Sequence, residues 1–332
     1  MTVGTPTLWA ITLAAVLALI AVDFLITRRP HEVSLREAAL WSSFYVALPL
    51  GFAGWVWWQY GGERGTEFLA GYLVEKSLSV DNLFVFMLLL GAFAVPSALA
   101  QRVLLYGIVG ALVLRGIFIA AGAALLSAGT WAFLLFGAVL LVTAAKVLRD
   151  ALRGNEHQVD PGSMRGTRLL RRLMPVTDSY HGARLTVRQA GRRALTPMAL
   201  VVAAVFLTDV VFAVDSVPAV YGVTSDPYLV FATNAFALLG LRALYFVLRN
   251  ALAKLRHLNH GLAIILAFIG GKLVLHWAHT VWVWVPDVPT PLSLLVIVAT
   301  LAIVTATSLL ANRREVAAGS RQAAPVSDAG VG

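Results

Sequence analysis

The sequence predicts an all-α protein that crosses a membrane about nine times. Its 332 residues are 59% hydrophobic and only 13% charged, with a mean hydropathy of +0.80, whereas soluble proteins carry about 25% charged residues. Apolar segments of about 20 residues recur along the chain, and a helix of that length crosses a hydrocarbon core of about 30 Å. The chain has no cysteine, which excludes disulfide frameworks, zinc ribbons, iron–sulfur clusters and thiol nucleophiles. An ordinary soluble enzyme is excluded as well.

The expected spans divide the chain into leading helices, two three-helix units and a last helix. The nine spans are 7–27, 38–59, 68–92, 102–126, 129–149, 196–220, 228–248, 258–280 and 291–311. The corresponding units are 1–60, 68–149, a loop at 150–195, 196–280, 291–311 and a tail at 312–332. Because Arg28 and Arg29 follow the first apolar run and no basic residue precedes it, this run is expected to be a retained helix and not a cleaved signal.

The basic residues of the loops predict the orientation of the chain. If the N-terminus lies outside, twenty Lys and Arg residues fall on the cytoplasmic side and only Arg64 falls on the other side. Cytoplasmic loops carry such an excess, so we expect the N-terminus outside and the C-terminus inside. The net charge of +9 then follows from topology and does not indicate a nucleic-acid partner.

The loop at 150–195 is the one sizeable polar segment, and it is strongly basic. Its residues 184–196 alternate around a glycine, a pattern typical of a short β-hairpin. His157 and His181 are expected to be surface histidines. The tail at 312–332 is rich in Ala, Gly and Ser and is predicted to be disordered.

Nine charged residues fall inside the expected spans. An ionised group in the middle of a bilayer costs about 3 kcal/mol, so nine isolated charges would cost roughly 25 kcal/mol. They must be paired, hydrated or bound to an ion. A salt-bridged bundle core and an ion pathway are both possible, and the pathway is the usual role of such groups. The nine are Glu75, Lys76, Asp81, Arg115, Lys146, Asp209, Asp215, Arg242 and Lys272.

These charges occur twice in the same order. EKSLSVDN at 75–82 and DVVFAVDS at 209–216 each place an acid six residues before the aspartate of a Val-Asp pair, which a small polar residue follows. An arginine and then a lysine follow in the next two helices of each unit. In the expected topology the two units have opposite orientations, and an inverted repeat with polar groups near the midplane is typical of transporters.

Helix geometry limits which of these acids share a site. Residues six apart differ by about 120° around a helix, whereas residues seven apart align, as Glu75 does with Asn82. The second acids reach the same site only if the helices unwind locally or if the site has two layers of ligands; Pro218 and the serines at 77–79 make unwinding plausible. We expect one cation near the midplane, with Glu75 and Asp209 in a second layer or carrying protons. Its expected ligands are Asp81, Asn82, Asp215, Ser216 and backbone carbonyls.

Oxygen ligands favour a hard divalent cation such as Mn²⁺, Ca²⁺ or Mg²⁺, because soft ions prefer sulfur. We expect this ion to be transported, with no permanently bound cofactor. The basic residues would act as counter-charges that hold the acids when the site is empty, and a binding cation would have to displace them. These counter-charges are Lys76, Arg115, Lys146, Arg242 and Lys272.

Three further side chains are weaker candidates. Asn234 fits either a third-helix ligand or a hydrogen-bonded amide between helices. His276 and His279 lie near the expected outer surface, where they fit ordinary helix-end histidines or a metal entry site. No Walker A, HExxH or nucleophile-elbow motif is present, so we do not expect an enzyme.

Several of these motifs resemble the TerC family of integral membrane proteins. The similarity covers the second to the ninth span, and it is closest at EKSLSVDNLFVF, PVTDSYHG, LTDVVFAVDSVPAV, LGLRALYF and GGKLVL. It implies a multi-pass protein of the bacterial inner membrane that exports manganese or maintains calcium and manganese levels. The acids Glu75, Asp81, Asp209 and Asp215 match the proposed metal ligands of the family.

The resemblance also implies a link to tellurium resistance. Tellurite is an anion that paired carboxylates repel, so we expect this effect to be indirect. A second hypothesis is a membrane scaffold that partners the secretion machinery and supports metallation of exported proteins, with 150–195 as its docking surface. The leading hypothesis is a secondary exporter of Mn²⁺, or Ca²⁺, driven by an ion gradient.

Overall fold

The computed structural model describes residues 2–26, 35–153, 175–177, 179–189, 192–241, 244–245, 258–282 and 284–322. This part of the chain is mostly helical and contains nine α-helices and one β-hairpin. The helices are α1 (Pro6–Ile26), α2 (Leu35–Tyr60), α3 (Gly62–Ala92), α4 (Ser97–Ala128), α5 (Trp131–Leu152), α7 (Pro197–Tyr221), α8 (Pro227–Leu239), α10 (Leu258–Val281) and α11 (Thr290–Gln322).

Eight of the nine expected spans coincide closely with one of these helices, and the seventh, 228–248, extends beyond the end of α8. Seven of the helices are long and apolar enough to cross a membrane. The two helices that do not meet this criterion, α3 and α8, fail it for different reasons. Helix α3 carries the charged motif at 75–82, which lowers its hydropathy. Helix α8 has only 13 residues, which is about 20 Å of helix. The structure is therefore that of a polytopic all-α membrane protein.

Helix α8 lies at the centre of the bundle. All of its residues from Tyr228 to Leu239 are buried, and it packs against α1, α2, α3, α4 and α7. Its N-terminus is set by Asp226, whose carboxylate accepts the Tyr228 amide hydrogen at 2.9 Å, and by Pro227 in the first helical position. The short helix is thus enclosed by the helices that carry most of the charged motifs.

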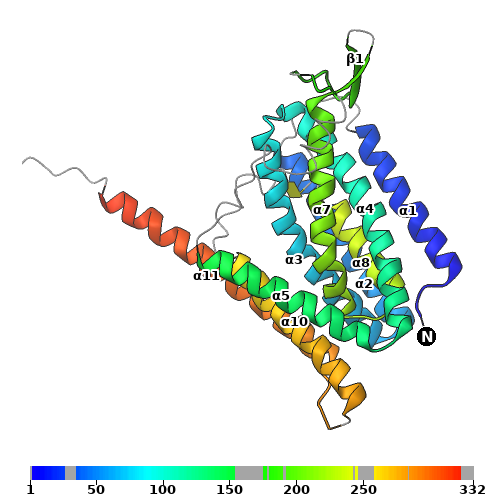
Figure 1. Cartoon of the computed structure of the whole chain (residues 1–332). Helices are drawn as coiled ribbons and strands as arrows, with labels where there is room; N and C mark the ends of the chain where they lie inside the picture. Colours follow the sequence, from blue (N-terminus) through cyan, green and yellow to red (C-terminus); the bar gives the residue numbers. More distant parts are fainter. Residues whose placement is uncertain are drawn as a thin grey trace, which may run out of the picture.

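Helices α5, α10 and α11 form an oblique group across the bundle (Figure 1). Helices α5 and α10 pack closely along their length, and their closest approach uses two glycines. A Cβ on Gly137 would lie 2.9 Å from the Gly270 carbonyl oxygen, and a Cβ on Gly270 would lie 3.1 Å from the Gly137 carbonyl oxygen. Small residues permit this approach between membrane helices.

A β-hairpin lies at one end of the bundle, and the N-terminus lies at the opposite end (Figure 1). Strand β1 (Thr186–Gln189) pairs antiparallel with β2 (Arg192–Leu195), within the segment expected to alternate. This region is attached to both motif helices. Strand β2 continues directly into α7 along the chain. The Tyr180 hydroxyl donates to the carbonyl of Phe93, the residue after α3, at 2.8 Å.

Two expectations about local structure are wrong. Helices α3 and α7 run through both acidic motifs without unwinding. The serine hydroxyls do not break α3, since Ser77 donates to the Leu73 carbonyl one turn back at 2.5 Å, and Pro218 lies near the end of α7. Helix α11 continues to Gln322, so the first half of the expected disordered tail is helical, because its alanines are strong helix formers. Residues 323–332 lie outside the described residues.

Candidate functional site

A fully buried arginine on α4 joins acids from the two motif helices. The Arg115 guanidinium donates through Nη1 to Glu75 Oε1 on α3, and its Nη2 lies 3.4 Å from Asp209 Oδ1 on α7. Nη1 also donates to Asn234 Oδ1 on α8 at 2.8 Å. All four side chains are at most 1% exposed. Buried charges need such partners, so this cluster links four helices in the interior of the bundle.

Asn82 completes the cluster from α3. In the amide orientation that satisfies both polar atoms, Oδ1 accepts from Arg115 Nη2 at 3.1 Å and Nδ2 donates to the Leu78 carbonyl at 3.0 Å. Glu75 and Asn82 reach the same guanidinium because residues seven apart align on a helix. Asn234 is held in a similar way, since its Nδ2 donates to the Val230 carbonyl at 2.9 Å. The Arg115 cluster is defined here as Glu75, Asn82, Arg115, Asp209 and Asn234.

The Arg115 cluster retains oxygen atoms that could bind a cation. Among the described residues, Glu75 Oε2, Asp209 Oδ2 and the motif hydroxyl Ser216 Oγ are buried without a hydrogen-bond partner. Two carboxylates share one guanidinium, so the cluster carries one excess negative charge when both acids are ionised. Buried polar atoms are normally satisfied, and hard cations prefer oxygen ligands. The donor set of the cluster therefore fits a hard cation.

The described residues contain no group of three or more His, Asp or Glu side chains placed to hold a metal ion by themselves. Two of the expected acids, Glu75 and Asp209, meet on Arg115. The side chain of Asp81 lies outside the described part of the chain, as does the whole of Arg242. A cation at the cluster would thus be bound by two of the motif carboxylates together with amide and hydroxyl oxygens.

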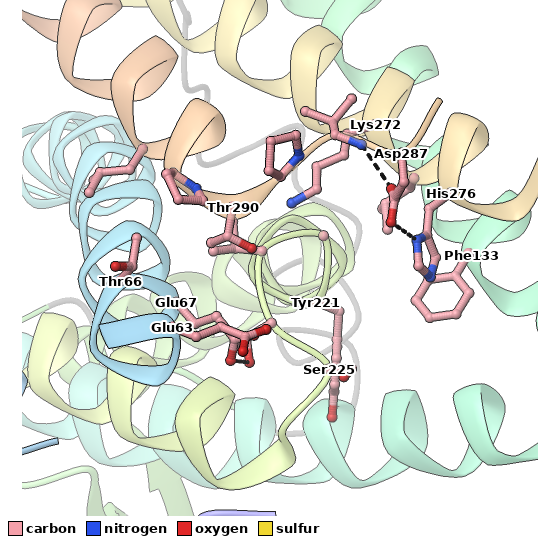
Figure 2. Close-up of a pocket in the computed structure, with 18 of the residues that line it drawn as sticks. Glu63, Thr66, Glu67, Phe133, Tyr221, Ser225, Lys272, His276, Asp287 and Thr290 are labelled. Atoms are coloured by element: carbon pink, nitrogen blue, oxygen red, sulfur yellow. Dashed lines mark hydrogen bonds and ion pairs between the residues drawn. The ribbon is translucent and has the colours of Figure 1, made fainter. Parts of the chain in front are cut away.

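Two cavities lie on opposite sides of the Arg115 cluster. The far-side cavity, of about 860 Å³, lies where α3 begins, α7 ends and α11 begins (Figure 2). Its polar lining includes Glu63, Glu67, Lys272, His276 and Asp287. The hairpin-side cavity, of about 710 Å³, lies between the middle of α7, the second half of α3, the end of α5 and the start of α10. Its polar lining includes Asn82, Lys146, Asp150, Thr208 and Asp215.

The expected counter-charges are distributed between these sites. Arg115 pairs with the motif acids Glu75 and Asp209. Lys146 lines the hairpin-side cavity together with Asp215, whereas Lys272 is buried against the far-side cavity. Lys76 is half-buried, and its Nζ lies 3.5 Å from the Ala237 carbonyl oxygen on α8. The two lysines that occupy matching positions in the sequence repeat therefore face opposite cavities.

The histidines make local contacts. His276 Nδ1 lies 3.1 Å from Asp287 Oδ2 at the edge of the far-side cavity, and His279 Nδ1 lies 2.5 Å from the Val285 carbonyl oxygen. His181 is exposed and contacts the Ser179 carbonyl at 3.0 Å. His157 lies outside the described residues.

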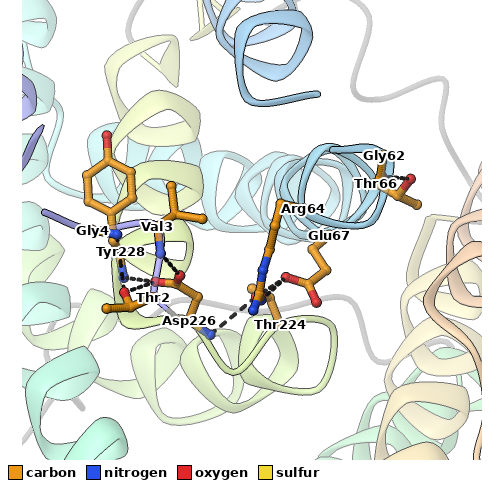
Figure 3. Close-up of polar contacts among 10 residues, drawn as sticks. All are labelled: Thr2, Val3, Gly4, Gly62, Arg64, Thr66, Glu67, Thr224, Asp226 and Tyr228. Atoms are coloured by element: carbon orange, nitrogen blue, oxygen red, sulfur yellow. Dashed lines mark hydrogen bonds and ion pairs between the residues drawn. The ribbon is translucent and has the colours of Figure 1, made fainter. Parts of the chain in front are cut away.

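A polar cluster at the far end of the bundle was not expected from the sequence (Figure 3). Glu67 accepts hydrogen bonds from Arg64 and Thr224, both at 2.8 Å. Asp226 also accepts from the Thr2 hydroxyl at 3.0 Å, besides capping α8. The Asp-Pro pair at 226–227 is a recognisable helix start, but nothing in the sequence indicates that residues near the N-terminus contact it.

Comparisons with known proteins agree with this architecture. Residues 60–316 match the "Integral membrane protein TerC family". The "Uncharacterized membrane protein STKORF319" of Myxococcus xanthus is 41% identical over 274 residues, which cover 82% of this chain and 85% of that protein. The "Putative membrane-bound redox modulator Alx" of Escherichia coli (strain K12) is 42% identical over 284 residues, covering 82% and 87%. The "Uncharacterized membrane protein MT2795" of Mycobacterium tuberculosis is 42% identical over 275 residues, covering 82% and 68%.

No solved structure matches the chain. The family match at 60–316 covers the helices that hold the Arg115 cluster. The chain therefore belongs to the TerC family of integral membrane proteins.

Proposed function

We propose that this protein is a secondary transporter that moves a hard divalent cation across a bacterial inner membrane, with the Arg115 cluster as its binding centre. One observation carries the proposal. Arg115 joins Glu75 and Asp209 in the bundle interior, yet each acid keeps one buried carboxylate oxygen without a partner among the described residues. Ionisable groups at such depth in a membrane protein usually mark an ion pathway.

The donor set supports a hard ion. Carboxylate, amide and hydroxyl oxygens suit Mn²⁺ or Ca²⁺, whereas a soft ion such as Cu⁺ needs thiolates or thioethers, and this chain has no cysteine. We infer that Mn²⁺ is the main cargo. Asp81 and Asp215, which belong to the same motifs, would contribute to the cation's coordination or entry.

Arg115 would act as a competitor for the cation. Its guanidinium contacts one oxygen of each acid, so a cation that bridges Glu75 and Asp209 has to displace one or both contacts. This competition lowers affinity, and a transporter must bind its ion weakly enough to release it. No permanently bound cofactor is needed for this cycle.

The arrangement also supports an inverted repeat. Helix α3 begins at the far-side cavity and α7 ends there, so the two acidic motifs run in opposite directions. Lys146 and Lys272 face opposite cavities, as an inverted repeat of the three-helix units would require. Such a repeat allows a transporter to alternate between inward-open and outward-open states.

A redox role, as in the name of the Escherichia coli relative, would have to be indirect in this chain. A cysteine-free protein has no thiol couple of its own. An effect on redox state would pass through the cation that it moves or through another protein.

Uptake of Mn²⁺ into everted membrane vesicles tests the proposal. Vesicles containing the wild-type protein should accumulate Mn²⁺ in the presence of an ion gradient, and Glu75→Gln or Asp209→Asn should abolish this uptake. Asp226→Asn is the matched control, because Asp226 is a buried acid whose contacts are structural. Competition by Ca²⁺ measures the selectivity.

Uptake that persists in both centre variants would reject the Arg115 cluster as the binding centre. The scaffold hypothesis makes a different prediction. If the basic loop serves as a docking surface, replacing 155–170 by a neutral linker should remove the cellular phenotype while Mn²⁺ uptake continues.

A further inference from the structure

We propose that the structure shows the central site open to the hairpin-side cavity and closed to the far-side cavity, and that Tyr221 is the residue that closes it. This inference rests on the proposed transport function, because it assigns the route by which the cation reaches the Arg115 cluster. It concerns access, which can be measured without transport.

The two cavities differ in their contact with the cluster. Asn82 lines the hairpin-side cavity and also accepts a hydrogen bond from Arg115. The cavity therefore reaches the cluster directly. The far-side cavity is lined by no member of the cluster. An ion in the hairpin-side cavity can therefore meet a member of the cluster, Asn82, whereas an ion in the far-side cavity cannot.

Buried apolar side chains flank the cluster on its helices in the direction of the far-side cavity. Val74 precedes Glu75 on α3, Ile119 follows Arg115 by one turn on α4, and Val217 follows Ser216 on α7. These three and Ile269 of α10 are at most 2% exposed and belong to the same buried cluster as Tyr221. A hydrated cation cannot pass such buried apolar side chains without a large desolvation cost.

Tyr221 lies among these apolar side chains. It lines the far-side cavity, yet it is only 2% exposed. Its hydroxyl donates to the Ile119 carbonyl at 2.7 Å, and its ring packs 5.9 Å from that of Phe136. A Cβ on Gly122 would lie 2.7 Å from the Tyr221 ring, so the glycine provides the space that the ring fills. The Tyr221 side chain thereby connects α7 to α4 and α5 at the point where a path from the far-side cavity to the Arg115 cluster would open.

Tyr221 also stands where α7 is able to bend. Pro218 lies inside the helix, three residues before Tyr221. Proline lacks an amide hydrogen and removes one helical hydrogen bond, which makes this a common position for a kink. A change of bend at Pro218 would withdraw the Tyr221 ring from Gly122 and open this path, while the motif at 209–216 stays in place.

Single-cysteine labelling tests this proposal, and the native chain has no cysteine to remove. Ser216→Cys places a thiol on α7 between Asp209 of the central site and Tyr221, and membrane-impermeant charged methanethiosulfonates are applied to right-side-out and to everted vesicles. Two exposed reference positions identify the sides: Thr186→Cys on the hairpin and Ser225→Cys in the far-side cavity. Ser216→Cys should react severalfold faster from the side that labels Thr186→Cys.

The gate is then tested in the Ser216→Cys background. Tyr221→Ala should raise labelling from the far side severalfold, and Tyr221→Phe, which loses only the hydrogen bond to Ile119, should raise it less. Tyr228→Ala is the matched control, because Tyr228 is a buried, hydrogen-bonded tyrosine near the same end of the bundle but outside the path. It should leave the pattern unchanged. Each variant is used only if it elutes as folded protein in size-exclusion chromatography.

Equal labelling from the two sides, faster labelling from the far side, or no labelling from either side would overturn the access assignment. An unchanged pattern in both Tyr221 variants would overturn the gate. These outcomes are distinct from failure of the proposed function. Sided labelling combined with absent Mn²⁺ uptake would reject transport and keep the access assignment.

Discussion

Glu75 and Asp209 bind the same guanidinium although they are 134 residues apart and lie on helices of opposite direction. Their shared partner, Arg115, is fully buried, and so are both acids. The two acidic motifs are therefore joined through one shared basic residue. Stability, ion binding and access to the site should all depend on this one side chain.

Arg115→Met should strongly destabilise the protein. The substitution leaves two buried carboxylates without their counter-charge, and removing one partner of a buried ion pair costs about 3–5 kcal/mol. Unfolding of the purified protein in detergent, followed by circular dichroism, measures the loss. Glu75→Gln in the Arg115→Met background should recover part of it, because one uncompensated charge disappears.

The control for Arg115→Met is Arg64→Met. Arg64 pairs with Glu67 at 2.8 Å, but its side chain is 26% exposed, and such pairs contribute about 0–1 kcal/mol. If Mn²⁺ binds between the acids, it should also raise the melting temperature of Arg115→Met more than that of the wild type. Equal losses in the two arginine variants would contradict the role given to Arg115.

Gly137→Ala should weaken the contact between α5 and α10. The added Cβ would lie 2.9 Å from the Gly270 carbonyl oxygen and 2.8 Å from a Val274 methyl group, and overpacking of this kind costs about 1–3 kcal/mol. Gly271→Ala is the matched control on α10, because no atom lies within 4 Å of its added Cβ. It should be neutral or stabilising by up to about 1 kcal/mol. Thermal unfolding that ranks the two variants in the opposite order would refute the close approach.

Asp226→Ala should loosen the start of α8 and the adjoining chain. The carboxylate caps α8 through the Tyr228 amide and accepts from the Thr2 hydroxyl, and loss of an N-cap costs about 1 kcal/mol. Hydrogen exchange should speed up at the first turn of α8 and near residue 3. The Thr5 hydroxyl, which accepts from the Leu8 amide at an exposed position, provides a control. Thr5→Ala should affect only the first turn of α1.

The contact of Tyr180 with Phe93 should persist in mildly alkaline solution. Burial raises the pKa of the Tyr180 phenol above its ordinary value of 10.0. The folded state therefore binds this proton more tightly than the unfolded state. The resulting stability is fully present below pH 10 and is lost as the pH rises through the folded pKa. The difference between the ultraviolet titrations of wild type and Tyr180→Phe should show a phenol that ionises above pH 10, and ionisation at or below pH 10 would contradict the burial.

The sequence allowed prediction of the helical segments better than of their contacts. Apolar runs of about 20 residues indicated where the helices lie, since only a helix satisfies its backbone in lipid, although α8 is shorter than the run at 228–248. Hydropathy did not predict where the last helix ends, because α11 extends beyond its apolar part to Gln322. Hydropathy reports what faces lipid, and it gives no information about where a helix ends in water.

The candidate site was predictable as a set of charges but not as a set of pairs. Glu75, Arg115 and Asp209 were conspicuous because each is costly in a membrane, and the spacing of Glu75 and Asn82 predicted a shared face. That Arg115 would pair with both acids, while Lys146 and Lys272 face separate cavities, depends on how helices pack. No local pattern encodes the contact of Asp226 with Thr2, because these residues are 224 positions apart.

Helix α8 has a consequence for how the protein is made. Its residues from Tyr228 to Leu239 are buried, and the helices that enclose it, α1, α2, α3, α4 and α7, all precede it in the chain. Ribosomal synthesis therefore completes its surroundings before α8 emerges. The arrival of Asn234 on this segment supplies the last described partner of Arg115, so the polar centre matures only at this late stage of membrane insertion.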